Sequence, residues 1–128
     1  MDPFTDQERK MLEQLTLPLA FFQNEKGQNI PLLVSDGFCQ MLGISREWVM
    51  KEPTGSKFVR VHPEDVGRVA HAVRSFWKKE SDYDVLYRVL RADQTYHYIH
   101  SVAFWWPMPD GAEMILVIYL DQIGRAHV

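Results

Sequence analysis

The spacing of apolar positions changes along the chain, and each change predicts a helix or a strand. A capping-box pattern at Thr5 and Glu8 precedes apolar residues at helical intervals, which predicts a short amphipathic helix over residues 6–15. Two apolar runs on either side of a polar, glycine-containing loop predict a β-hairpin formed by residues 19–23 and 31–35. The second strand begins with a proline, which has no N–H to donate. We therefore expect this strand to begin irregularly or to lie at a sheet edge.

The middle of the chain is predicted to be helical. Asp36 is a candidate N-cap for a short helix that ends at Gly43, and Ser45 is a candidate cap for a further turn. Pro63 suits the first turn of a longer helix, and the two acidic residues after it suit the helix dipole. Apolar residues then recur at helical intervals as far as Lys78. We interpret the segment around Pro63 as a helix start and not as an active site.

The last third of the chain predicts three consecutive strands. Apolar side chains alternate over residues 85–90, and turn-forming residues separate two further runs, 96–106 and 114–120. The final run is apolar throughout, which is typical of a strand that is buried on both faces. The predicted order is therefore a helix, two strands, short helices, one long helix and three strands, which is an α+β arrangement.

Composition and charge narrow the class of protein. The 128 residues are 46% hydrophobic and 24% charged, as in a single globular domain. The formal net charge of −3 gives no reason to expect nucleic acid or an anionic membrane as a partner. No apolar run approaches the length of a membrane-spanning helix. A single cysteine, Cys39, and a polar N-terminus without a signal-peptide pattern predict a cytoplasmic location.

Residue types that carry chemistry are scattered. The five histidines include no helical i, i+4 pair of the kind that binds zinc, so no metal site is predicted. No serine lies in a Gly-x-Ser-x-Gly elbow, and spacing alone assigns no nucleophile to a base. We therefore expect that this chain is not itself an enzyme.

Three segments, in this order and at these separations, resemble a PAS domain, a small sensory module of signalling proteins. They are residues 34–43 (VSDGFCQMLG), 61–66 (VHPEDV) and 87–96 (YRVLRADQTY). The resemblance covers residues 17–121, and it implies a five-stranded antiparallel sheet in the order 2-1-5-4-3 with helices on one face. The short N-terminal helix, within residues 1–16, would cap this PAS fold.

The resemblance also implies a signalling context. The sequences of the first two segments are similar to those of the N-terminal PAS domains of bacterial GGDEF or EAL proteins, which synthesise or degrade cyclic di-GMP. A PAS domain of this kind would regulate a covalently attached C-terminal output domain, and a histidine kinase is the main competing output. A haem-based sensor and a ligand-free interaction domain are the two other functions that we considered.

The C-terminal residues do not fit the pattern of the domain. Residues 122–128 have no apolar period, and the codons ATC-GGA-AGA-GCA-CAC-GTC of a common sequencing adapter encode the last six of them in order. We expect the native sequence of this segment to end near Asp121, with the output domain missing. A natural tail is the alternative.

Aromatic residues are numerous and allow two interpretations, a filled core or a cavity for a planar small molecule. The candidate cavity residues are Phe22, Phe38, Leu42, Trp48, Phe58, His71, Tyr87, Val89, Ser101 and Ala103. Some PAS domains ligate haem through a histidine on the long helix, which makes His71 the candidate ligand. Its charged neighbours belong to a solvated face, so haem is disfavoured, and we expect no cofactor or an unknown small molecule. Cys39 lies outside the motif that forms flavin adducts in light-sensing relatives.

Strand parity predicts an apolar outer sheet face. If Val85, Tyr87 and Val89 face the helices, the alternate residues of the last strands face away from them. An exposed sheet face is not expected to be this apolar, so the N-terminal helix and a second protomer should cover it. The candidate residues of this outer face and of a homodimer interface are Leu12, Leu15, Leu86, Tyr98, Val102, Phe104 and Trp106.

Overall fold

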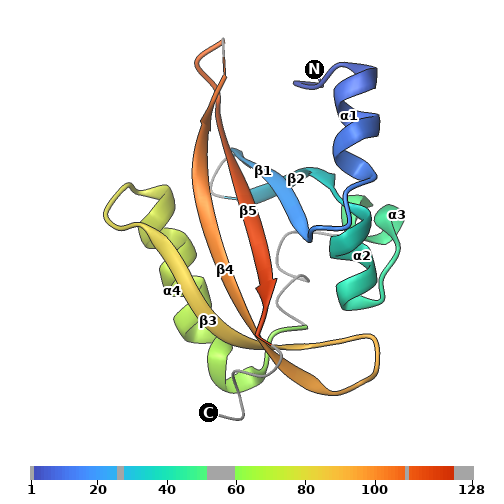
Figure 1. The fold of residues 1–128 in the computed structure, drawn as a ribbon. Coiled ribbons are helices and arrows are strands. Elements are labelled where there is room, and N and C mark those ends of the chain that lie inside the picture. Colours follow the sequence, from blue (N-terminus) through green and yellow to red (C-terminus); the bar gives the residue numbers. More distant parts are fainter. Residues whose placement is uncertain (1, 26–27, 52–59, 109, 123–128) are drawn as a thin grey trace.

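A computed structural model describes residues 2–25, 28–51, 60–108 and 110–122. Within them the chain forms a single antiparallel sheet with helices packed on its inner face and one helix at the N-terminal side (Figure 1). In chain order the elements are α1 (Asp6–Glu13), β1 (Leu19–Glu25), β2 (Gln28–Val34), α2 (Asp36–Leu42), α3 (Arg46–Lys51), α4 (Pro63–Trp77), β3 (Tyr83–Leu90), β4 (Tyr96–Pro107) and β5 (Glu113–Asp121). The strands lie in the order β2-β1-β5-β4-β3, which confirms the predicted topology.

Local sequence signals set most of the helix boundaries. Thr5 Oγ1 accepts a hydrogen bond from the Glu8 N–H at 3.1 Å, and the Glu8 carboxylate accepts one from the Thr5 N–H at 2.8 Å, so the predicted capping box is confirmed. The helix ends at Glu13 and not at Leu15, because the Leu15 N–H donates to the Leu12 carbonyl in a tightened last turn. The predicted helix was thus two residues too long.

The N-cap of α2 differs from the prediction. Ser35, not Asp36, precedes the helix, and its buried hydroxyl accepts from the Phe38 N–H at 3.2 Å. The same hydroxyl donates to the Leu17 carbonyl at 2.7 Å, so one side chain ties the helix start to the chain that enters β1. The helix ends as predicted, because Gly43 adopts the left-handed conformation with φ 68°.

The proline in β2 has the expected effect. The strand lies at an edge of the sheet, and its register with β1 shifts between Phe21 and Phe22, opposite Pro31 and Leu33. The shift accommodates a residue that cannot donate to the ladder.

Apolar side chains form two clusters, one on each face of the sheet. The larger cluster packs against α2, α3 and α4, and the smaller one joins Leu19, Phe21, Leu33 and Met114. Strand β5 contributes to both clusters, so the predicted burial of this strand on both faces is confirmed for its first half, whereas Leu120 near its end is 40% exposed. The inward parity of β3 is also confirmed, since Val85, Tyr87 and Val89 are all buried.

Helix α1 covers only part of the outer face. Leu12, together with Phe4, packs on the smaller cluster, whereas Leu15 is 41% exposed and lies outside it. The outward side chains of β3 and β4 remain largely uncovered, and Val102 alone of the predicted set there is half-buried. The exposed members are Leu86 (43%), Tyr98 (42%), Phe104 (51%) and Trp106 (45%). Helix α1 thus packs on part of this face, and the second protomer expected on the remainder stays a prediction.

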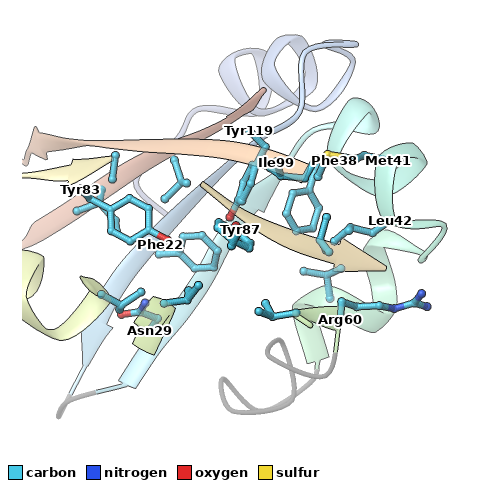
Figure 2. Close-up of a pocket in the computed structure, with 18 of the residues that line it drawn as sticks. Phe22, Asn29, Phe38, Met41, Leu42, Arg60, Tyr83, Tyr87, Ile99 and Tyr119 are labelled. Atoms are coloured by element: carbon cyan, nitrogen blue, oxygen red, sulfur yellow. The ribbon is translucent and has the colours of Figure 1, made fainter. Parts of the chain in front are cut away.

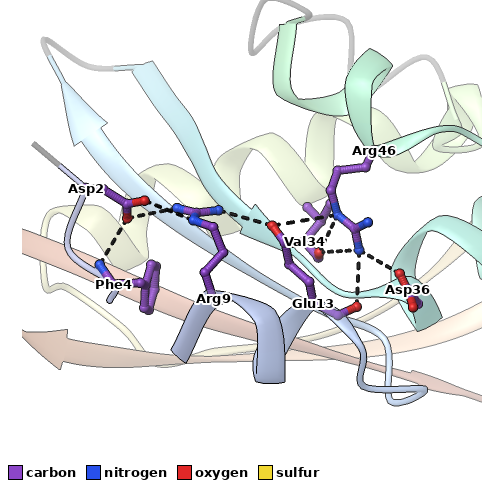
Figure 3. Close-up of polar contacts among 7 residues, drawn as sticks. All are labelled: Asp2, Phe4, Arg9, Glu13, Val34, Asp36 and Arg46. Atoms are coloured by element: carbon purple, nitrogen blue, oxygen red, sulfur yellow. Dashed lines mark hydrogen bonds and ion pairs between the residues drawn. The ribbon is translucent and has the colours of Figure 1, made fainter. Parts of the chain in front are cut away.

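An ion-pair network explains where α1 lies. Arg46 of α3 donates to the Glu13 and Val34 carbonyls, each at 3.1 Å, and to the Asp36 carboxylate at 2.7 Å (Figure 3). Arg9 continues the network within α1 by pairing with Glu13 at 3.2 Å. These contacts hold the C-terminal end of α1 beside the starts of α2 and α3, away from β3 and β4.

Candidate functional site

An apolar cavity of about 130 Å³ lies between the inner face of the sheet and the helices (Figure 2). Its wall combines side chains from α2, α3, α4 and four of the strands with those of Asn29 on β2 and Arg60 and Val61 before α4. The main apolar and aromatic contributors are Phe22, Phe38, Met41, Leu42, Trp48, Val69, Val73, Phe76, Tyr83, Tyr87, Val89, Ile99, Ala103, Ile115, Val117 and Tyr119. Such a wall suits an apolar ligand and offers few polar contacts.

Seven of the ten predicted cavity residues line it. They are Phe22, Phe38, Leu42, Trp48, Tyr87, Val89 and Ala103. Ser101 is fully buried beside the cavity, where its hydroxyl donates to the Tyr87 hydroxyl at 3.1 Å. His71 is exposed on α4 and is not among the lining residues. Phe58 lies outside the described residues.

Three tyrosines contribute hydroxyl groups to the otherwise apolar cavity wall. Tyr83 and Tyr87 project inward from β3, and Tyr119 projects inward from β5, directly across the sheet from Ser101 on β4 (Figure 2). Burial raises the pKa of all three hydroxyls, and in Tyr119 the neighbouring Tyr87 and Tyr83 raise it further. The hydroxyls are therefore uncharged hydrogen-bonding groups at neutral pH.

Sequence reasoning missed Tyr83 and Tyr119 as cavity residues. Both have the inward parity of their strands, since Tyr83 alternates with Val85, and Tyr119 alternates with Val117. The last strand is apolar at every position, so its alternation does not indicate which side chains face the cavity.

Neither the candidate haem ligand nor the single cysteine lines the cavity. His71, the candidate haem ligand, is exposed and points away from the cavity wall. Cys39 is half-buried on α2, and it is not a lining residue. Burial raises the pKa of its thiol, so the reactive thiolate is disfavoured. Neither group is placed to react with a molecule in this cavity.

A buried carboxylate fastens α4 to the edge of the sheet. Asp65 is 6% exposed and accepts hydrogen bonds from the Arg88 backbone N–H at 2.8 Å, from Nε at 3.0 Å and from Nη2 at 2.9 Å. These contacts hold the pKa of Asp65 well below its usual range. The predicted helix start at Pro63 is confirmed. The sequence placed Arg88 on the outer face, yet its side chain reaches around edge strand β3 to α4.

Comparisons with known proteins agree with this architecture. A family model described as the PAS fold matches residues 31–118. The chain belongs to the PAS family. Among curated proteins, none matches it significantly. No helix in the described part of this PAS domain has the length and apolar character needed to cross a membrane.

Solved structures show the same fold at low sequence identity. A sensory box histidine kinase/response regulator from Burkholderia thailandensis is 21% identical with a TM-score of 0.64, over 88% of this chain and 81% of the other. A PAS domain from Colwellia psychrerythraea is 18% identical with a TM-score of 0.67, over 90% and 93%. The LOV domain of a blue-light activated histidine kinase from Erythrobacter litoralis is 21% identical with a TM-score of 0.61, over 85% and 98%. These likenesses agree with the family model in showing the PAS fold.

Proposed function

We propose that this PAS domain is a sensory and dimerisation module that regulates a C-terminal output domain, which we assign as a diguanylate cyclase or a cyclic di-GMP phosphodiesterase. The observation that carries the proposal is the uncovered apolar part of the outer sheet face. Leu86, Tyr98, Phe104 and Trp106 expose between 42% and 51% of their surface there. Full burial of such a side chain contributes roughly 1.5–3 kcal/mol, so a partner on this face would gain substantially.

A second copy of this chain is the partner that we assign to the outer face. The exposed residues follow β4 from Tyr98 to Trp106 and continue onto Leu120 of β5, which is 40% exposed. An isologous contact along these strands brings the same residues of both protomers together. A two-fold axis that runs along the strands would also place the two ends of β5 near each other, which suits an output enzyme that works as a dimer.

Strand β5 offers a path from the cavity to the output domain. Tyr119 faces the cavity, whereas its neighbours Ile118 and Leu120 face the outer side. Arg91 supports the same path, because its Nε donates to the Met41 carbonyl at 2.8 Å while its guanidinium pairs with Asp121. Met41 lines the cavity, and Asp121 ends β5. A ligand that binds more tightly to one position of β5 and Arg91 than to another would shift the activity of the output domain.

The identity of the output domain rests on weaker support. The resemblance of residues 34–42 and 61–66 to PAS domains of GGDEF and EAL proteins supports a cyclic di-GMP enzyme. The solved structures from histidine kinases favour a kinase as the second candidate. A cytoplasmic location, expected from the single free cysteine, is part of the proposal. Residues 123–128 lie outside the described residues, and sequencing the source locus past the Asp121 codon would test for such a domain.

Sedimentation equilibrium tests the dimer. The wild-type chain should associate, and Phe104→Glu should weaken the association at least tenfold, because each 1.4 kcal/mol changes the constant tenfold. Met11→Glu is the matched control, since Met11 is 63% exposed on α1. A wild-type chain that stays monomeric, or a Phe104→Glu variant that dimerises normally, would contradict the proposal and favour a ligand-binding module without dimerisation.

A further inference from the structure

The size of the cavity restricts what it can hold. Its volume is about 130 Å³, and a dry apolar cavity of roughly 150 Å³ is enough to bind benzene. The space as it stands is therefore close to that of a single six-membered ring. The stacked and edge-on rings of Phe76 and Trp105, 4.9 Å apart, and of Phe38 and Tyr119, 5.2 Å apart, already show aromatic packing beside it.

The charge of the wall restricts the ligand further. Among the described lining residues, Arg60 is the one with a charged side chain, and its guanidinium turns away from the tyrosines in Figure 2. No carboxylate from the described residues lines the cavity. Burial of an ion without a partner is costly, so a molecule inside this wall should be uncharged.

Tyr119 supplies the hydrogen-bonding position. Its ring is edge-on to Phe38, and within the described part of the chain its hydroxyl makes no hydrogen bond, like the buried indole N–H of Trp77 in the same wall. Tyr87 differs in that its hydroxyl oxygen already accepts the Ser101 hydrogen bond at 3.1 Å, although its own proton remains available. Both phenols remain protonated at neutral pH, since burial raises the pKa of each. Tyr119 can therefore donate to an oxygen acceptor in the cavity at no cost to an existing bond.

We infer that the cavity binds a small, uncharged, monocyclic aromatic molecule that carries one oxygen acceptor, and that Tyr119 donates the hydrogen bond that selects it. This inference rests on the proposed sensory function and specifies its ligand class. Apolar packing supplies most of the affinity, and the hydroxyl supplies the discrimination between an aromatic ketone or ether and a plain hydrocarbon.

Three probes of equal heavy-atom number test the ligand class. Acetophenone carries the acceptor, cumene replaces it with a methyl group, and benzoate carries a charge. Titration calorimetry and saturation-transfer NMR on the wild-type chain should show acetophenone binding about three- to tenfold more tightly than cumene, and benzoate binding most weakly. Equal binding of acetophenone and cumene, or tightest binding of benzoate, would overturn the inference.

Tyr119→Phe isolates the hydroxyl. This variant should bind acetophenone as weakly as the wild type binds cumene, with cumene affinity unchanged. Tyr98→Phe is the control, because Tyr98 is 42% exposed on the opposite face and should leave both affinities unaltered. A variant at Tyr119 that keeps the wild-type preference would show that another group selects the acceptor, against the inference.

Filling the cavity shows where the probes bind. Ala103→Leu should abolish binding of acetophenone and cumene together, and Val73→Leu serves the same purpose if the first variant does not fold by circular dichroism. Binding that survives in a folded, filled variant would place the probes elsewhere and refute the inference. Failure of all probes would refute the ligand class alone, because the proposed dimer is judged independently by the sedimentation of Phe104→Glu.

Discussion

Phe22 and Phe104 lie on opposite faces of the same sheet, and their surroundings differ sharply. Phe22 is 5% exposed beneath the helices, whereas Phe104 is 51% exposed on the outer face. The inner face is closed by three helices and encloses a cavity, while the outer face is covered in part by α1 and otherwise open. The sheet therefore has a ligand-sized cavity on one face and an uncovered apolar surface on the other.

The two faces also fasten their helices differently. On the inner side, Asp65 of α4 is buried and bonds to Arg88 of β3. On the outer side, α1 has no buried residue and is held through Arg46, whose side chain is 33% exposed. Solvent weakens interactions between partly exposed charges, so α1 should detach more easily than α4.

The largest expected effect comes from a matched pair of phenylalanine truncations. Phe22→Ala should lower the free energy of unfolding by about 3–5 kcal/mol, because it removes a buried ring from a packed cluster. Phe104→Ala should lower it by less than about 1 kcal/mol at dilute, monomeric concentration, since exposed substitutions have small effects. Urea unfolding of both variants measures the difference. Similar losses would show that the two faces are equally buried in solution.

Removal of the buried carboxylate should have the next largest effect. Asp65→Asn should cost on the order of 2 kcal/mol, because it weakens charge-assisted hydrogen bonds to Arg88. The pKa of Asp65 is lower in the folded state than its unfolded value of about 4, so its contribution is present above that value and is lost as the pH falls below it. Wild type should therefore lose stability more steeply than Asp65→Asn below about pH 4. Parallel acid titrations of the two proteins, followed by circular dichroism, test this contribution. Equally steep losses of stability would refute it.

The attachment of α1 gives a smaller expected effect. Arg46→Ala removes the hydrogen bonds to Glu13, Val34 and Asp36 and should cost about 1–2 kcal/mol. It should also release α1 and uncover Phe21, so binding of a hydrophobic dye should increase while the sheet stays folded. Arg74→Ala, an exposed position on α4, is the control. Unchanged dye binding in the Arg46 variant would mean that packing alone holds α1.

The smallest expected effect concerns the start of α1. Thr5→Ala removes the capping box and should cost about 1 kcal/mol, expressed as faster amide exchange in α1 with no change in α4. Thr95→Ala, in the turn between β3 and β4, provides a control for loss of a threonine hydroxyl. Slowed or unchanged exchange in α1 would show that the cap does not limit its opening.

Sequence determined the features that depend on neighbouring residues. The capping box at Thr5, the helix stop at Gly43 and the parity of β3 were all predictable, because each depends on spacing within a few positions. The strand order came from the resemblance to PAS domains and not from periodicity. Most of the predicted cavity residues line the cavity because inward parity and apolar character select the same side chains.

Tertiary structure alone decided the contacts between distant segments. Arg46 bonds to Glu13, 33 positions away, and Asp65 bonds to Arg88, 23 positions away. No local pattern marks such partners, because a charged side chain binds whichever opposite group the fold brings near. The same reason explains the partial cover by α1 and the cavity position of Tyr119. Short-range rules set the elements, and the packing of those elements sets which polar groups meet and which apolar face stays open.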